Sequence, residues 1–312
     1  MTEEANYGVY IGYPKGYISE FNNAHSAMKD ENGEVIARFG GRNGTEGQLG
    51  YGVQNSPQTV MPIPAKMEVM WFSGTENQFW SGEFELPKNE LVHALKDEKI
   101  LDLFTTRSGS REKKYDQIVV NVAPKGKVYV YLRGIPAKLL ATYQAKPIKY
   151  DWLKHVDETW AIKGNEIESQ DEYVELMKKD YINIFDKVNQ YYKEDFFTPV
   201  RWKLRIKGDK KILAFAVKTV NGEYTQVFDD PTEQEIKSIP TEIAFDVEEK
   251  GKVSRYNFEL HHSYEFYKKN FTNTSLVYML IDIPDPDHAF LYFKQGDKTV
   301  EFTDFVPSEL DR

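Results

Sequence analysis

A pattern of strands and a helix that occurs twice along the chain most constrains the fold. Both copies contain an Ile-Pro pair, a strand, a turn, a second strand ending in Phe-Glu-Leu, a helix, and two further strands separated by a proline-containing turn. These elements lie at 63–86, 89 onwards and 119–132 in the first copy, and at 239–260, 263 onwards and 277–293 in the second. The order of elements therefore predicts two tandem related modules with a large, repeated surface.

The expected fold class is α+β, with each module a mostly antiparallel sheet that carries one packed helix. A longer amphipathic helix at 169–193 is expected to join the modules, because Ser169 and Glu172 form a capping box and apolar residues recur every three or four positions behind it. The alternative is that this apolar stripe docks a partner helix. The predicted modules are residues 1–160 and residues 161–312.

The second module is expected to open with a hairpin. Residues 200–206 alternate between apolar and basic side chains, Gly208-Asp209 forms a turn, and 212–220 returns. Alternation places Trp202, Leu204 and Ile206 on one face, which is expected to be buried, and the basic residues Arg201, Lys203 and Arg205 on the wet face. Basic residues on an open strand face also oppose edge-to-edge aggregation.

Charge and composition exclude some classes of function. The chain has 312 residues, a formal net charge of -9 and no cysteine. Nucleic-acid binding is not expected, since that affinity depends on clustered Lys and Arg, whereas a basic protein surface would be attracted. Without cysteine there is no thiol catalysis, disulfide or thiolate metal site.

No catalytic motif is recognisable, and neither a catalytic residue, a metal nor a cofactor is expected. The best metal candidates are two neighbouring histidines and nearby acidic groups, but adjacent strand residues point to opposite faces and cannot chelate one ion together. These candidates are His261, His262, Asp282, Asp285, Asp287 and His288. A hydrolase stays open as an alternative, because the chain's 49 acidic residues always offer carboxylate pairs.

Two loops are the candidate binding segments. One is the glycine-rich segment 40–52, which contributes Arg42, Asn43 and Tyr51 as candidate partner-binding residues. It is also interpretable as a wide connection containing glycine bulges. The other is the turn at 73–78, which contributes Thr75, Glu76 and Asn77 and would bring Trp71 and Trp80 together across a hairpin. Such tryptophans serve either the core or a protein interface.

The residues of the first copy also carry a resemblance to a known family. The relevant runs are Pro64–Ser73, Gln78–Trp80, Glu85–Pro87 and Asp116–Gly134. They resemble a family of uncharacterised bacterial proteins, a domain of unknown function in predicted lipoproteins, many of which are encoded beside type VI secretion phospholipase effectors. The resemblance is best over about 35–150 and weaker over the second copy.

The resemblance implies a non-enzymatic immunity protein that binds and neutralises a toxic lipase effector. It implies a periplasmic location with a lipid anchor; the acidic N-terminus of this chain lacks a secretion signal and a lipidated cysteine, which favours the cytoplasm if that N-terminus is native. The alternative function is a carbohydrate- or ligand-binding protein of the cell envelope, for which Trp71, Trp80 and Trp202 would form an exposed platform.

Overall fold

The computed structural model describes residues 3–42, 47–98, 114–159, 167–185, 187–228, 231–272, 275–285 and 288–309. Strands account for 48% of the chain and helices for 17%. Contacts divide the described residues into two compact units, one made of those up to residue 193 and the other of those from residue 194 onwards. No described helix is long and apolar enough to cross a membrane.

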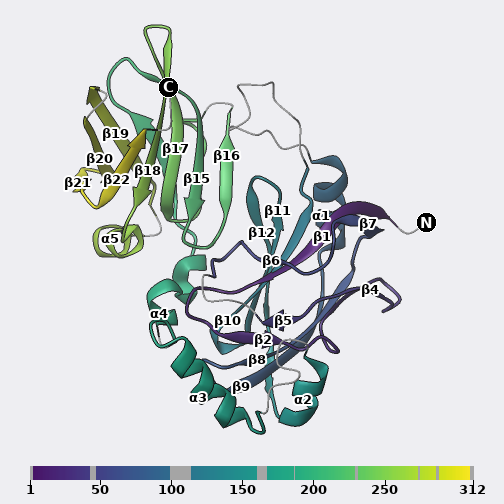
Figure 1. Cartoon of the computed structure of the whole chain (residues 1–312). Coiled ribbons are helices and arrows are strands. Elements are labelled where there is room, and N and C mark those ends of the chain that lie inside the picture. Colours follow the sequence, from purple (N-terminus) through teal and green to yellow (C-terminus); the bar gives the residue numbers. More distant parts are fainter. Residues whose placement is uncertain are drawn as a thin grey trace. The chain divides into compact units, whose positions relative to one another are not determined.

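The first sheet of the first unit is built around the N-terminal strand (Figure 1). Its order is β12-β11-β10-β1-β6, with β7 also paired to β1. β1 and β10 are parallel, with Gly8 opposite Gln117, and the other pairs are antiparallel. The strands are β1 (Glu4–Gly12), β6 (Val53–Gln54), β7 (Thr59–Pro62), β10 (Gln117–Ala123), β11 (Lys127–Arg133) and β12 (Ala137–Gln144).

The second sheet of this unit is antiparallel and has the order β13-β9-β8-β2-β5, with β3 pairing both β8 and β4. Its strands are β2 (Ser19–Phe21), β3 (Ala27–Lys29), β4 (Val35–Arg38), β5 (Gly41–Arg42), β8 (Lys66–Ser73), β9 (Gln78–Glu85) and β13 (Lys146–Ile148). The β8–β9 hairpin confirms the predicted turn, since Trp71 lies opposite Trp80.

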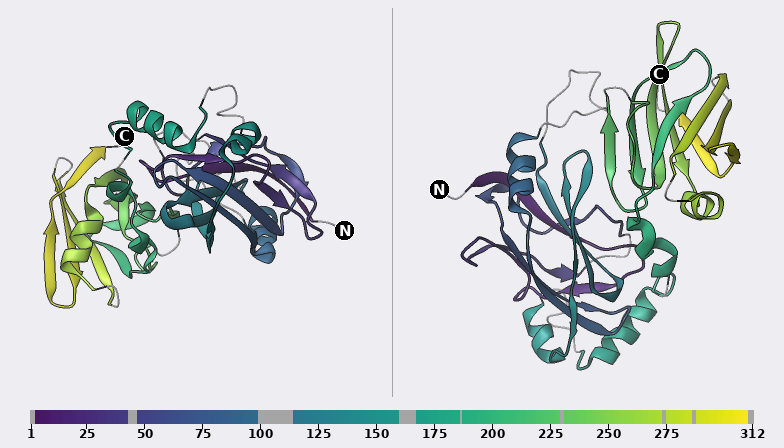
Figure 2. Two further views of the ribbon diagram at one scale, coloured as in Figure 1. Left: turned by 90° about the horizontal axis from the view of Figure 1, so that it is seen from below. Right: turned by 180° about the vertical axis from the view of Figure 1, so that it is seen from behind.

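Short helices accompany these sheets. In the first unit they are α1 (Lys88–Val92), the π-helix η1 (His93–Asp97), the 3-10 turn η3 (Pro124–Gly126), α2 (Trp152–Glu158), α3 (Gln170–Asp180) and α4 (Val188–Tyr191). α2 and α3 cover one face of the β8–β9 sheet (Figure 2), where Phe72 and Phe79 pack against Trp152 and Tyr173. The last five residues of β8 are all buried, as expected for a strand covered on both faces.

The second unit also contains two sheets. One has the order β16-β15-β17-β18-β22 and is antiparallel; the other has the order β14-β19-β20-β21, with β14 and β19 parallel. The elements are η4 (Glu194–Phe197), β14 (Trp202–Ile206), β15 (Lys211–Thr219), β16 (Tyr224–Val227), β17 (Pro240–Glu249), β18 (Lys252–Leu260), α5 (Ser263–Asn270), β19 (Val277–Asp285), β20 (His288–Gln295), β21 (Lys298–Phe302) and β22 (Phe305–Glu309).

The two units share a sequence of pairings. In each, one hairpin precedes a short helix and a second hairpin follows it: β8–β9, α1 and β10–β11 in the first unit, and β17–β18, α5 and β19–β20 in the second. The two hairpins lie in different sheets, and an early strand joins the second hairpin in parallel, β1 in one unit and β14 in the other.

The expected α+β class is wrong, because the described part of the chain is mostly β, with several sheets and five short α-helices. The long joining helix at 169–193 is also wrong. Ser169 does cap α3 by accepting a hydrogen bond from the Glu172 amide, but the helix ends at Asp180. The run Tyr181-Ile182-Asn183-Ile184 that follows has aromatic, β-branched and Asn residues, which have low helix propensity. α3 packs within the first unit.

The hairpin expected at 200–220 does not form. β14 pairs with β19, whereas β15 pairs with β16 and β17 in the other sheet. The predicted faces of β14 are confirmed for Trp202 and Leu204, which are fully buried, whereas Ile206 at the end of the strand is only partly buried. The described residues 167–185 and 187–193 fall by their contacts in the first unit.

Candidate protein-binding surface

The turn between β8 and β9 is held by its own polar residues. Glu76 accepts hydrogen bonds from the Tyr17 hydroxyl (2.8 Å), the Trp80 indole (3.1 Å) and the Lys125 amide (2.7 Å). Thr75 accepts one from the Ile18 amide at 2.9 Å. These two candidate residues therefore hold the turn against the residues that precede β2, against β9 and against the η3 turn.

Asn77 has a left-handed backbone (φ 51°) and contacts the first turn of α3. Its amide donates to Asp171 at 2.9 Å, and Gln170 donates to its side-chain oxygen at 2.8 Å. Arg42 ends β5 directly opposite Glu20, and Asn43 lies outside the described residues. The structure thus brings Thr75, Glu76 and Asn77 together in one turn, with Arg42 in another strand of the same sheet.

The described end of the glycine-rich segment packs tightly on β1. Asn121, fully buried in β10, accepts from the Gly50 amide at 2.7 Å and donates to the Tyr51 carbonyl at 2.8 Å. A Cβ added to Gly12 would lie 2.2 Å from the Tyr51 carbonyl oxygen, and one added to Gly47 would lie 2.2 Å from that of Tyr13. Glycine is needed here for close approach of two backbones.

This docking places Tyr51 against Arg133 at the end of β11. The Arg133 guanidinium lies 3.7 Å from the centroid of the Tyr51 ring, a cation–π contact. Burial lowers the pKa of Arg133, while Tyr51, Tyr10 and Asp116 act in the opposite direction. Burial also raises the pKa of Tyr10, with Asp116 adding to the rise. Within the described part of the chain, the guanidinium has no hydrogen bond or ion pair.

We call Tyr10, Tyr51 and Arg133 the arginine–tyrosine cluster. Tyr10 in β1 pairs with Gln54 in the edge strand β6. The edge exposes apolar side chains, because Val53 in β6 is 65% accessible and Val60 in β7 is 63% accessible. The sequence of β1 and β11 does not identify Tyr10 or Arg133 as binding residues. Their proximity to Tyr51 depends on how the segment 47–52 folds back onto β1.

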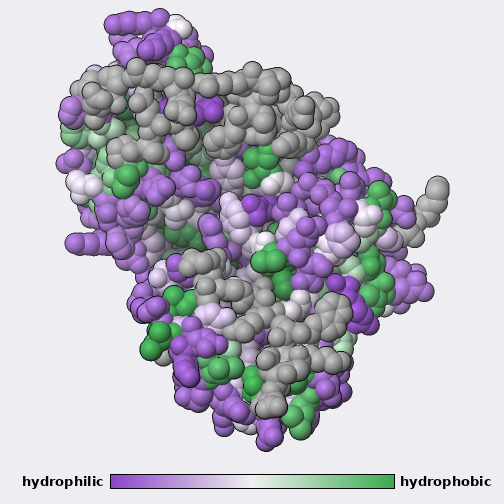
Figure 3. All heavy atoms as spheres, viewed as in Figure 1, coloured by the Kyte–Doolittle hydropathy of each residue, from purple (hydrophilic) through white to green (hydrophobic). Residues whose placement is uncertain are grey.

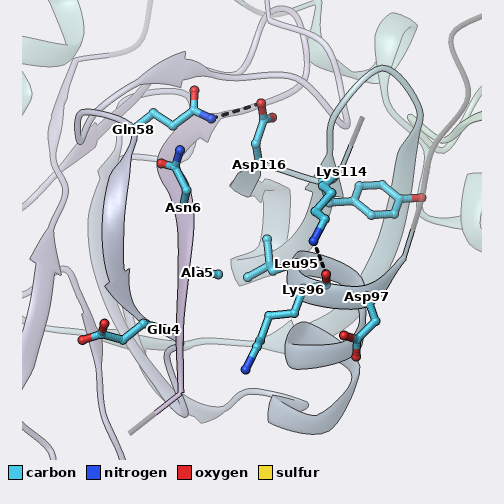
Figure 4. Close-up of a pocket in the computed structure, with 10 residues that line it drawn as sticks. Glu4, Ala5, Asn6, Gln58, Leu95, Lys96, Asp97, Lys114 and Asp116 are labelled. Carbon is cyan, nitrogen blue, oxygen red and sulfur yellow. Dashed lines mark hydrogen bonds between the residues drawn. The ribbon is translucent and has the colours of Figure 1, made fainter. Parts of the chain in front are cut away.

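A polar hollow of about 520 Å³ lies beside this cluster. Figure 4 shows Asn6 on the β1 side, Lys96 and Lys114 on the other, and a hydrogen bond from Gln58 to Asp116. Asp116 is common to the hollow and to the electrostatic environment of Tyr10. On the side shown in Figure 3, the described surface is mostly hydrophilic with separate hydrophobic spots.

A second polar cluster, which sequence reasoning missed, surrounds a buried histidine. The His155 ring nitrogen Nδ1 lies 3.2 Å from the Asn22 amide nitrogen, which can only donate, so Nε2 carries the proton. Burial lowers the pKa of His155 to about 4, and the imidazole is neutral. Among the residues that the structure describes, Nε2 has no hydrogen-bond partner. The ring meets Phe79 edge-on, with centroids 4.9 Å apart. His155 therefore serves packing of α2.

The other candidates from the sequence do not converge. Among the described residues no three His, Asp or Glu side chains could hold a metal ion together; Asp287 lies outside them. His262 pairs with Asp304 at 2.8 Å. The three tryptophans do not form an exposed platform, because Trp71 and Trp202 are fully buried.

Comparison with known proteins adds one finding. No curated protein and no solved structure matches the chain significantly. A family model described as "Protein of unknown function (DUF2931)" matches residues 3–193, which contain every residue of the arginine–tyrosine cluster and the hollow beside it. The chain belongs to this family, DUF2931.

Proposed function

We propose that this protein is a non-enzymatic binding protein, an immunity protein that binds and neutralises a lipase-type effector of a type VI secretion system. The observation that carries the proposal is the arginine–tyrosine cluster. Tyrosine and arginine are the residues that most often contribute binding energy at protein interfaces. Here a half-buried guanidinium stacked on Tyr51 has lost solvation without gaining a hydrogen bond or an ion pair within the described residues, and the Asp116 carboxylate acts on it only at longer range.

A partner carboxylate that reached Arg133 would supply the missing charge-assisted hydrogen bonds. The exposed Val53 and Val60 of the neighbouring edge strands would add apolar contact, and the hollow beside them would accept a partner side chain. At longer range, the net charge of -9 would attract a basic partner and speed its association. In this role the protein acts in the periplasm, and a full-length form would be held at the membrane by a lipidated N-terminal cysteine, a residue type that these 312 residues do not contain.

The test uses the purified lipase encoded beside the gene of this protein. We expect a stable complex with the wild-type chain, and Arg133→Ala and Tyr51→Ala each to weaken binding by about 30-fold, the loss expected for a residue worth about 2 kcal/mol. Ile182→Ala, which trims a 77% accessible residue of the same unit, is the control that should bind normally.

Absence of a complex, together with equal killing of cells with and without this protein, would refute the immunity role. A complex that is unaffected by Arg133→Ala and Tyr51→Ala would refute only the assignment of the surface.

A further inference from the structure

The sheet β14-β19-β20-β21 of the second unit has one buried face and one open face. Trp202, Leu204 and Met279 are fully buried on the inner side, and Figure 1 shows β19, β20 and β21 as a layer separate from β15, β17 and β18. The alternate residues, on the open face, are all partly or fully exposed. They form three rows that run across the strands from β14 towards β21. The first row is Lys203, Tyr278, Lys294 and Thr299, and the middle row is Arg205, Leu280, Tyr292 and Glu301. The third row is Lys207, which follows β14, with Asp282 and Phe290.

The middle row has a regular arrangement of charge. Arg205 lies opposite Leu280, Leu280 opposite Tyr292, and Tyr292 opposite Glu301. Across the four strands the row therefore runs from a cation through an apolar and an aromatic residue to an anion. Arg205 also forms an ion pair with Glu233 of the same chain at 3.0 Å, which a second anion would share or replace. All three outward positions of β14 and its extension are basic, whereas those of β21 are Thr299 and Glu301.

The centre of this face is apolar and accessible. Phe290 is 39% accessible, and Leu280 and Tyr292 are partly exposed. Cations already approach the tyrosine rings, with Arg205 5.5 Å from the Tyr278 centroid and Lys207 4.4 Å from that of Tyr292. A sugar stacking on these rings would have to compete with those cations, and a polyanion would be repelled by the net charge of -9.

We infer that this face binds the same face of a second copy of the chain, about a two-fold axis that runs parallel to the strands between β19 and β20. That rotation lays β14 over β21 of the other copy and β19 over β20 of the other copy. Arg205 of each copy then contacts Glu301 of the other, which gives two symmetry-related ion pairs. Leu280 of each copy contacts Tyr292 of the other. A two-fold axis across the strands would instead lay the basic column of β14 over itself.

The size of the face predicts a weak dimer. Strands about 4.8 Å apart and alternate residues about 7 Å apart give a face roughly 15–20 Å on a side, which would bury on the order of 400 Å² per copy. Stable complexes usually bury about 800 Å² per partner. Repulsion between two acidic chains weakens association further, so the dimer should form reversibly at micromolar or higher concentration.

The experiment is sedimentation of the full chain from micromolar to near-millimolar concentration. We expect wild type to shift from monomer to dimer, and Leu280→Glu to stay monomeric. Val253→Glu adds the same charge at a 54% accessible position of β18 and should dimerise like wild type. Circular dichroism and the unfolding temperature establish that each variant is folded.

The charge pairing has a sharper test. Arg205→Glu alone and Glu301→Arg alone each oppose like charges across the axis and should be monomeric. An equimolar mixture of the two pairs opposite charges at both contacts and should dimerise. The inference is overturned if wild type stays monomeric at every concentration. It is also overturned if Leu280→Glu and Val253→Glu behave alike, or if the mixture of folded Arg205→Glu and Glu301→Arg variants does not associate.

Discussion

Replacing Asn121 by alanine should destabilise the first unit more than its two hydrogen bonds alone would suggest. The side chain holds the Gly50 amide and the Tyr51 carbonyl, and Asn121 itself is fully buried. The surroundings are closely packed, since a Cβ on Gly12 would lie 2.5 Å from the Asn121 amide nitrogen. Alanine would leave the buried Gly50 amide and the partly buried Tyr51 carbonyl without partners.

Each unsatisfied buried group costs about 1–3 kcal/mol, so the expected loss is about 2–5 kcal/mol. Asn55 is a matched control, because it accepts from the Gly40 amide at 2.8 Å and donates to the Gly40 carbonyl at 2.7 Å, but in a partly exposed position. Water can replace those bonds, and Asn55→Ala should cost only about 1 kcal/mol.

Urea unfolding followed by tryptophan fluorescence measures both variants. Asn121→Ala should also weaken lipase binding, because Tyr51 would no longer be held against Arg133. A loss for Asn121→Ala no larger than for Asn55→Ala would contradict the argument that buried, unreplaceable partners determine the cost.

Three further predictions concern stability. Between pH 7 and pH 4 the free energy of unfolding of wild type should fall by about 3 kcal/mol more than that of His155→Leu, as measured by urea titrations at each pH. The reason is that folding lowers the pKa of His155 from 6.5 to about 4, so that the unfolded chain binds the proton first as the pH falls. Gly126→Ala should lower the stability measured by thermal unfolding by about 2–4 kcal/mol, because φ is +71° and the new Cβ would lie 2.4 Å from the Trp80 ring. Gly33→Ala is the control: φ is +86° but the surroundings are open, so the loss should be about 1 kcal/mol. Glu76→Ala removes the acceptor of three hydrogen bonds and should lower the free energy of unfolding in urea by about 3–5 kcal/mol. Asn77→Gly, at φ 51°, should leave stability nearly unchanged. Equal losses for Gly126→Ala and Gly33→Ala, or for Glu76→Ala and Asn77→Gly, would contradict these assignments.

Local sequence signals predicted the individual hairpins but not the sheets that contain them. The turn after Ser73 and the pairing of Trp71 with Trp80 follow from alternation and turn residues within one short segment. Alternation says which face of a strand is buried, as for Trp202 in β14, but it does not identify the neighbouring strand. β14 pairs with β19, more distant in sequence than the expected partner β15. Helix propensity after Asp180 was likewise overestimated from apolar spacing alone.

The candidate surface was accessible to sequence reasoning only in part. Tyr51 was selected because it lies in the glycine-rich segment, yet its contact with Arg133 depends on the buried Asn121 and on the missing side chains at Gly12 and Gly47. No local pattern links residues so far apart in the chain. The buried His155 was overlooked for the same reason, since Asn22 contacts it from another element.

The position of β1 has a consequence for how the first unit is made. β6 and β7 on one side of this strand follow within the next fifty or so positions, but β10 on its other side begins only at Gln117. Contacts between such distant segments slow folding because a long loop must close first. During synthesis one hydrogen-bonding edge of β1 therefore stays unpaired until β10 has been made.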